Sequence, residues 1–165
     1  MALVIEDGTI VAGANSYVTV EEARAFALLR GVTLSAVDAE VEILVIEAMD
    51  YVEAKGSKFK GSKYTRDQSL QWPRSGATVD GYTVLTTEIP TDLTNAVSQL
   101  VIDGQDETLQ PTGAGQEILK EEVGPIKIEY AERGSSTVSA RFNKAEAFLK
   151  PVLRGSFAQA NVYRG

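Results

Sequence analysis

The amino-acid sequence predicts a mainly α-helical fold: a small bundle of about four helices with a minor β element and an extended C-terminal arm. Two patterns favour helices and a short strand over a larger sheet. Apolar residues recur with helical spacing in several stretches, while Ile126, Ile128 and Tyr130 alternate with polar residues as in a strand. The clearest helical pattern consists of Leu93, Ala96, Val97, Leu100 and Val101.

Composition narrows the possible functions. A length of 165 residues, 44% of them hydrophobic and 24% charged, fits one globular domain. The sequence has no histidine and no cysteine, which excludes Ser–His and Cys–His nucleophiles and removes the commonest metal ligand. We therefore expect no enzyme activity, cofactor or metal site. The net charge of −7 argues against DNA binding by the chain as a whole, but not against a local basic patch.

Features of membrane and exported proteins are missing from the sequence. No apolar run approaches the ~18 residues that a membrane-spanning helix needs. The first residues lack the basic and apolar regions of a signal peptide. We expect no membrane partner and synthesis in a cytoplasm.

The N-terminal third predicts a hairpin and two helices. The Asp7-Gly8 turn between two short apolar runs favours a small hairpin. Thr19 and Glu22 have capping-box spacing, which predicts a helix from Val20 to about Arg30-Gly31. Its expected buried side is formed by Ala23, Phe26, Ala27 and Leu29. The longest helix is expected over 36–55, at the centre of the bundle, with a neighbouring subunit as a further packing partner in one interpretation.

The second half predicts two more helices and a strand. A short strand is expected at 84–86, followed by a helix with Thr91 as N-cap and Asp103-Gly104 at its end. Residues 105–122 predict a long exposed connection with a helical turn at 116–120. A strand at 126–130 and a flexible turn at 134–139 follow. The last helix, which Pro151 kinks or ends, has its apolar face at Phe142, Ala145, Phe148, Leu149 and Val152. We expect one helical domain over 1–154 and an arm over 155–165.

The stretch 64–90 is the part around which the chain is organised. It contains the only tryptophan, in Trp72-Pro73-Arg74, and turn signals at Ser75-Gly76 and Asp80-Gly81. We interpret it as an irregular segment held by Trp72 between two helices. The alternative is a surface loop whose tryptophan fills a gap.

Basic and aromatic residues alternate over 55–74, where six of the sixteen basic residues lie. Such a segment can form a platform for single-stranded nucleic acid, a solvated loop, or a subunit contact that faces an acidic helix. The sequence leaves all three open. The candidate residues for the interface or nucleic-acid patch are Lys58, Lys60, Lys63, Tyr64, Arg66, Trp72 and Arg74.

The order of several short motifs resembles a family of small tailed-phage proteins. The motifs are Asn15-Ser16-Tyr17-Val18-Thr19, then Asp67-Gln68-x-Leu70-x-Trp72-Pro73-Arg74, then Ile89-Pro90 and Val123-Gly124-Pro125. Members of this family often carry the label putative DnaT-like single-stranded-DNA-binding protein. The resemblance covers about residues 14–155 and identifies the family with head–tail connectors, also called adaptor or neck proteins.

The resemblance implies a structural virion protein. It would be made in the host bacterial cytoplasm and lie in the neck, between capsid portal and tail. Its expected partners are further copies of itself in a twelve-fold ring, the portal protein, the next neck or tail protein (stopper or tail terminator), and genomic DNA that passes through without sequence-specific binding. In related adaptors the C-terminal segment inserts into the portal, which here implicates Phe157, Val162, Tyr163 and Arg164. The alternative function is single-stranded-DNA binding by the 55–74 segment.

Overall fold

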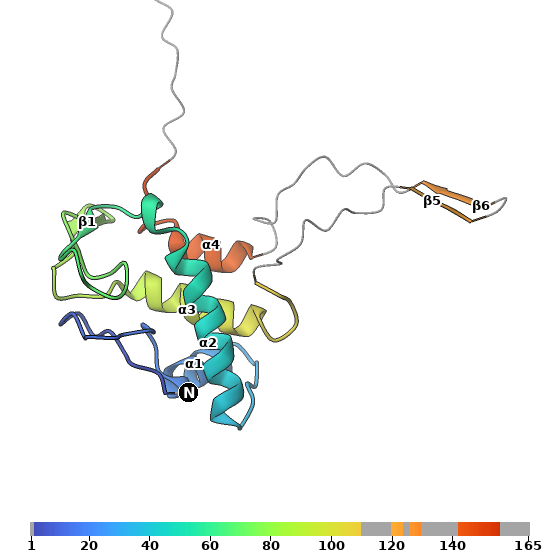
Figure 1. Cartoon of the computed structure of the whole chain (residues 1–165), viewed down its shortest axis with the longest axis horizontal. Coiled ribbons are helices and arrows are strands. Elements are labelled where there is room, and N and C mark those ends of the chain that lie inside the picture. Colours follow the sequence, from blue (N-terminus) through green and yellow to red (C-terminus); the bar gives the residue numbers. More distant parts are fainter. Residues whose placement is uncertain (1, 110–119, 124–125, 130–141, 156–165) are drawn as a thin grey trace, which may run out of the picture.

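The computed structural model describes residues 2–109, 120–123, 126–129 and 142–155, and Figure 1 shows their arrangement. The helices are α1 (Val20–Leu28), α2 (Asp38–Glu53), α3 (Thr91–Asp103) and α4 (Asn143–Leu149), with a 3-10 turn at Gly56–Lys58. The described residues also form three antiparallel strand pairs: β1 (Ser62–Lys63) with β2 (Arg74–Ser75), β3 (Thr78–Val79) with β4 (Tyr82–Thr83), and β5 (Lys120–Val123) with β6 (Ile126–Glu129). The predicted mainly α fold with a minor β element is confirmed.

Helix α3 is the centre of the bundle, where α2 was expected. It packs against α1, α2 and α4, and it buries Ser98 and Gln99 in addition to the five predicted apolar residues. Helix α2 cannot take this place, because Glu40, Glu47 and Asp50 are exposed on the side opposite its buried stripe. The helix with the lowest proportion of charged residues therefore occupies the core.

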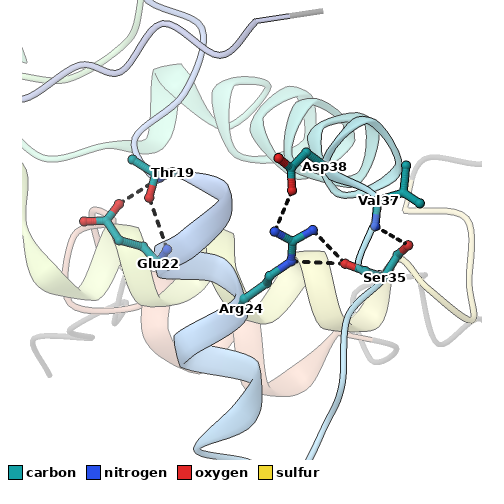
Figure 2. Close-up of polar contacts among 6 residues, drawn as sticks. All are labelled: Thr19, Glu22, Arg24, Ser35, Val37 and Asp38. Atoms are coloured by element: carbon teal, nitrogen blue, oxygen red, sulfur yellow. Dashed lines mark hydrogen bonds and ion pairs between the residues drawn. The ribbon is translucent and has the colours of Figure 1, made fainter.

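The first helix begins as predicted. The Thr19 hydroxyl accepts a hydrogen bond from the Glu22 backbone N–H, and the Glu22 carboxylate accepts one from the Thr19 N–H, so both halves of the capping box are formed (Figure 2). Arg24 then links α1 to the start of α2 through the Asp38 carboxylate, at 2.6 Å, and the Ser35 carbonyl. The prediction for Leu29 is wrong: it is 85% exposed.

The expected N-terminal hairpin is also wrong. A buried carboxylate organises this segment: Glu6, which is 1% exposed, accepts hydrogen bonds from the backbone N–H groups of Gly8, Ile10 and Val11. These donors would otherwise need a partner strand. Ile5 instead forms an isolated parallel bridge with Ser16, which lies beyond the loop.

Two further boundaries differ from the prediction. Pro90 is the N-cap residue of α3 and Thr91 is its first helical residue, without a side-chain cap. The strand expected at 84–86 lies earlier, as β4, because Asp80-Gly81 forms the hairpin turn. Both turn residues have positive φ, 50° and 86°, as a two-residue hairpin requires, and this pairs Val79 with Tyr82.

The region after α3 is described only in part. Residues 120–122, expected at the end of a long exposed connection, belong to β5, and this excludes Lys120 from the expected helical turn. The strand at 126–130 is confirmed as β6, although Tyr130 lies outside the described residues. The turn at 134–139 lies outside them as well. Helix α4 ends at Leu149, two residues before Pro151, so of the two expected effects of this proline the structure shows the end of the helix, and Val152 lies beyond it.

Candidate nucleic-acid interface

Trp72 anchors the irregular segment, as the sequence predicts. Its side chain is fully buried, and its ring meets that of Phe59 edge to face, with 6.0 Å between ring centroids. The neighbouring Pro73 is buried too. Because no part of Trp72 reaches the surface, it cannot stack on a nucleotide base. The prediction of Trp72 as a contact residue of the patch is therefore wrong, and the tryptophan supports the patch from the interior.

A polar network docks the same segment onto the helices. The Tyr17 hydroxyl donates to the Glu53 carboxylate at 2.6 Å and accepts from the Trp72 backbone N–H at 3.0 Å. The other Glu53 oxygen accepts from the Gln71 N–H at 2.8 Å. Burial raises the pKa of Glu53 above its ordinary value, against the lowering effect of these hydrogen bonds and of the Lys63 and Arg74 charges. Burial and the Glu53 carboxylate also raise the pKa of Tyr17.

The raised pKa of Glu53 gives the stability of the protein a pH dependence. Between the unfolded value of 4.5 and the higher folded value, the folded chain holds more protons than the unfolded chain. This contribution to the free energy of unfolding therefore decreases as pH rises through that window. We expect Glu53→Gln to remove the decrease, and urea denaturation of the variant and the wild type from pH 4 upward will measure it.

The matched control is Glu47→Gln, which removes an exposed carboxylate from the same helix. Its stability should follow the wild-type pH profile. If Glu53→Gln also follows the wild-type profile, burial of the Glu53 carboxylate is not the cause.

Arg74 stabilises the turn at Lys60-Gly61 from the protein interior. Its side chain is buried, and it donates to the carbonyl oxygens of Lys60 (2.8 Å), Gly61 (3.0 Å) and Gln71 (3.2 Å). Gly61 is required here, because its φ is 68° and a Cβ would lie 2.3 Å from the Ser75 carbonyl oxygen. Arg74 thus fixes the backbone that presents the neighbouring lysines, and is itself below the surface.

A short strand-like pairing extends the basic segment. The Lys60 N–H donates to the Val152 carbonyl at 2.9 Å, and the Arg154 N–H donates to the Lys58 carbonyl at 2.7 Å, with Phe59 opposite Leu153. Phe59 is buried in the core, so the alternation of side chains along an extended chain places Lys58 and Lys60 on the outer side. Arg154, next to Leu153, is exposed beside them.

These contacts bring Lys58, Lys60 and Arg154 together, and Lys63, Tyr64 and Arg66 follow Lys60 within six residues of the chain. We define the basic surface as Lys58, Lys60, Lys63, Tyr64, Arg66 and Arg154. Lys63 is half-buried and donates to the Gln68 carbonyl, whereas Arg66 is exposed and Tyr64 is 51% exposed. Exposed cations around an accessible aromatic ring can bind phosphates while the ring stacks on a base.

Lys55 does not join the basic surface. Its ammonium group forms a 2.7 Å ion pair with Glu146 and lies 4.5 Å from the centre of the Tyr51 ring. The Tyr51 hydroxyl donates to the same carboxylate, at 2.5 Å. This cluster joins α2 to α4, and its charges are balanced within the bundle.

A second charged surface lies along α2. Glu40, Glu47 and Asp50 are exposed around Ile43, whose side chain is 59% exposed. The described part of the chain contains no group of three acidic side chains arranged to hold a metal ion. None of its helices is long and apolar enough to span a membrane.

Comparison with known proteins places the chain in a family. The family model described as "Putative DnaT-like ssDNA binding protein" matches residues 1–165. The chain belongs to this family. No curated protein and no solved structure matched it.

The family description names single-stranded DNA and does not mention a phage neck, so the connector role remains a proposal. The sequence predicted five residues of the basic surface, but it missed Arg154. The five are Lys58, Lys60, Lys63, Tyr64 and Arg66. Arg154 lies far along the chain, and only the pairing of Phe59 with Leu153 brings it close. The candidate portal-docking residues Phe157, Val162, Tyr163 and Arg164 lie outside the described residues.

Proposed function

We propose that the protein binds single-stranded DNA through the basic surface. The observation that carries this proposal is the pairing of residues 58–60 with 152–154, which adds Arg154 to three lysines in a protein with a net charge of −7. Membership of a family described as DnaT-like and ssDNA-binding supports the same function.

The strand would bind by two kinds of contact. The lysine ammonium groups and the Arg154 guanidinium neutralise backbone phosphates, and this gives no sequence preference. Tyr64, half exposed at the end of β1, offers a ring on which a base can stack. Stacking of this kind contributes about 1–3 kcal/mol per base. A duplex hides its base faces, so it should bind more weakly than a single strand.

Oligo-dT binding, measured by fluorescence anisotropy at several salt concentrations, tests this function. We expect the logarithm of the association constant to decrease linearly with the logarithm of the salt concentration, with a slope near −0.7 for each phosphate contacted. The double variant Lys58→Gln/Lys60→Gln should bind about 10- to 100-fold more weakly at low salt, with the slope reduced in magnitude by roughly 1.4.

The charge-matched control is Arg30→Gln/Lys144→Gln, which removes two exposed cations outside the basic surface. It should bind as the wild type does. Equal losses in the two double variants would show that total charge governs binding, and an oligo-dT affinity too weak to measure at low salt would refute the function.

The second candidate function is the head–tail connector, and the acidic face of α2 favours it. A ring requires that one surface of a subunit fits a different surface of the next. The acidic face, with Ile43 at its centre, and the basic surface have opposite charges and could meet in this way. In this proposal the protein assembles beneath the portal, binds the next neck or tail protein, and lets genomic DNA pass.

Native mass spectrometry of the protein, alone and with its portal, tests the connector role. A defined ring on the portal that is lost when residues 155–165 are deleted would support it. A monomer that ignores the portal but binds oligo-dT would leave only the first function.

A further inference from the structure

Two guanidinium groups, one of them from the basic surface, donate to the same carbonyl oxygen. Arg74 Nη2 and Arg154 Nη2 each donate to the Gly61 carbonyl, both at 3.0 Å. Burial and, next, the positive charge of Arg154 lower the pKa of Arg74. The two like charges therefore repel each other across a single acceptor, and an anion bound between or beside them would offset that repulsion.

No protein carboxylate fulfils this role in the described part of the chain. The ion pairs found there join Arg24 to Asp38 and Lys55 to Glu146, and neither Arg74 nor Arg154 has a carboxylate within ion-pair distance. The charges of Tyr17 and then of Glu53 raise the pKa of Arg74, but the Glu53 oxygens already accept hydrogen bonds from Tyr17 and Gln71. The pair of arginines thus keeps an unbalanced positive charge.

The two arginines differ in what they can still bind. Arg74 is buried, and its Nε, Nη1 and Nη2 groups donate to protein oxygens. Arg154 is exposed, and its guanidinium makes only the bond to Gly61 among the described residues. Arg154 therefore retains N–H groups for an external anion, and a planar guanidinium matches the paired oxygens of a phosphate.

We propose that Arg154, held at Gly61 above the buried Arg74, is the phosphate-binding position of the basic surface. This inference rests on the proposed function and deepens it, because it assigns the strongest phosphate contact of a bound strand to one residue. Lys58, whose carbonyl accepts from the Arg154 N–H, stands beside it in the same pairing and would contact the next phosphate.

The experiment compares Arg154→Gln with Arg154→Lys and with Arg30→Gln, in the full-length protein. Arg30 is also an exposed arginine, and its guanidinium bonds to the Phe26 carbonyl, outside the basic surface. Circular dichroism will establish that each variant is folded. Oligo-dT affinity and its salt dependence are then measured by fluorescence anisotropy.

We expect Arg154→Gln to weaken oligo-dT binding about tenfold and to reduce the magnitude of the salt slope by roughly 0.7, the loss of one phosphate contact. Arg154→Lys should keep the slope, because it keeps the charge, and Arg30→Gln should match the wild type. If Arg154→Gln equals Arg30→Gln while the wild type still binds DNA, the assignment of Arg154 is overturned and the proposed function stands.

Inorganic phosphate provides the second arm, in case the wild type does not bind DNA at all. At equal ionic strength, 10 mM phosphate in place of chloride should then raise the thermal midpoint of the wild type more than that of Arg154→Gln, as for a site that takes free phosphate. Equal midpoint shifts in the two proteins would overturn the phosphate position itself.

Discussion

Replacing Trp72 with alanine is expected to lower the free energy of unfolding by about 3–5 kcal/mol, the largest effect of any single side chain considered. Trp72 is fully buried, and its removal leaves a cavity beside Phe59 at the point where the segment 64–90 meets the bundle. Urea denaturation followed by circular dichroism will measure the loss.

Trp72→Phe is the informative control for this prediction. A phenyl ring keeps most of the edge-to-face contact with Phe59. It also removes the indole N–H, which is buried without a hydrogen-bond partner among the described residues. We expect Trp72→Phe to cost less than half as much as the alanine change. A loss below about 1 kcal/mol for Trp72→Ala would contradict the anchoring role.

Replacing Arg74 with methionine is expected to cost about 2–4 kcal/mol of stability, because three carbonyl oxygens lose a buried donor. The oxygens belong to Lys60, Gly61 and Gln71. Methionine has a similar volume, no N–H group and no charge, so the change removes the hydrogen bonds together with the positive charge that Arg154 repels. Arg74→Lys should recover part of the loss, since one ammonium group cannot reach all three oxygens.

The Arg74 variants also separate stability from presentation of the basic surface. If Arg74 fixes the turn that carries Lys60, folded Arg74→Met at low temperature should bind oligo-dT more weakly than Arg74→Lys. Unfolding curves of Arg74→Met that coincide with those of the wild type would show that the turn at Gly61 is held by other contacts.

Local patterns predicted much of this fold. The capping box at Thr19 and the apolar spacing of α3 depend on residues within a few positions of one another, and both are confirmed. The Asp80-Gly81 turn is a local pattern too, because a two-residue hairpin turn requires positive φ at these two residues alone. The central place of α3 could not be predicted in this way, because which helix lies at the centre depends on how all the helices pack together.

The candidate site was predicted less completely for a related reason. Trp72 and Arg74 belong to a basic, aromatic stretch whose pattern predicts a single exposed surface, but both side chains are buried. Burial of Arg74 depends on the carbonyl groups of a turn thirteen residues away. Arg154 joins the basic surface because Leu153 pairs with Phe59, and these two residues are far apart in the sequence. A single sequence carries no signal for such a pair.

Photo-cross-linking tests the central claim most directly. An oligo-dT strand that carries 5-iododeoxyuridine is irradiated with the full-length protein, and the modified peptides are identified by mass spectrometry. Binding at the basic surface predicts that the cross-link lies on Tyr64, which is 51% exposed, and that it is lost in Lys58→Gln/Lys60→Gln. Cross-links on Tyr82 of β4, which is 80% exposed, with none on Tyr64, would contradict the claim. They would place the DNA-binding surface at the β3–β4 hairpin.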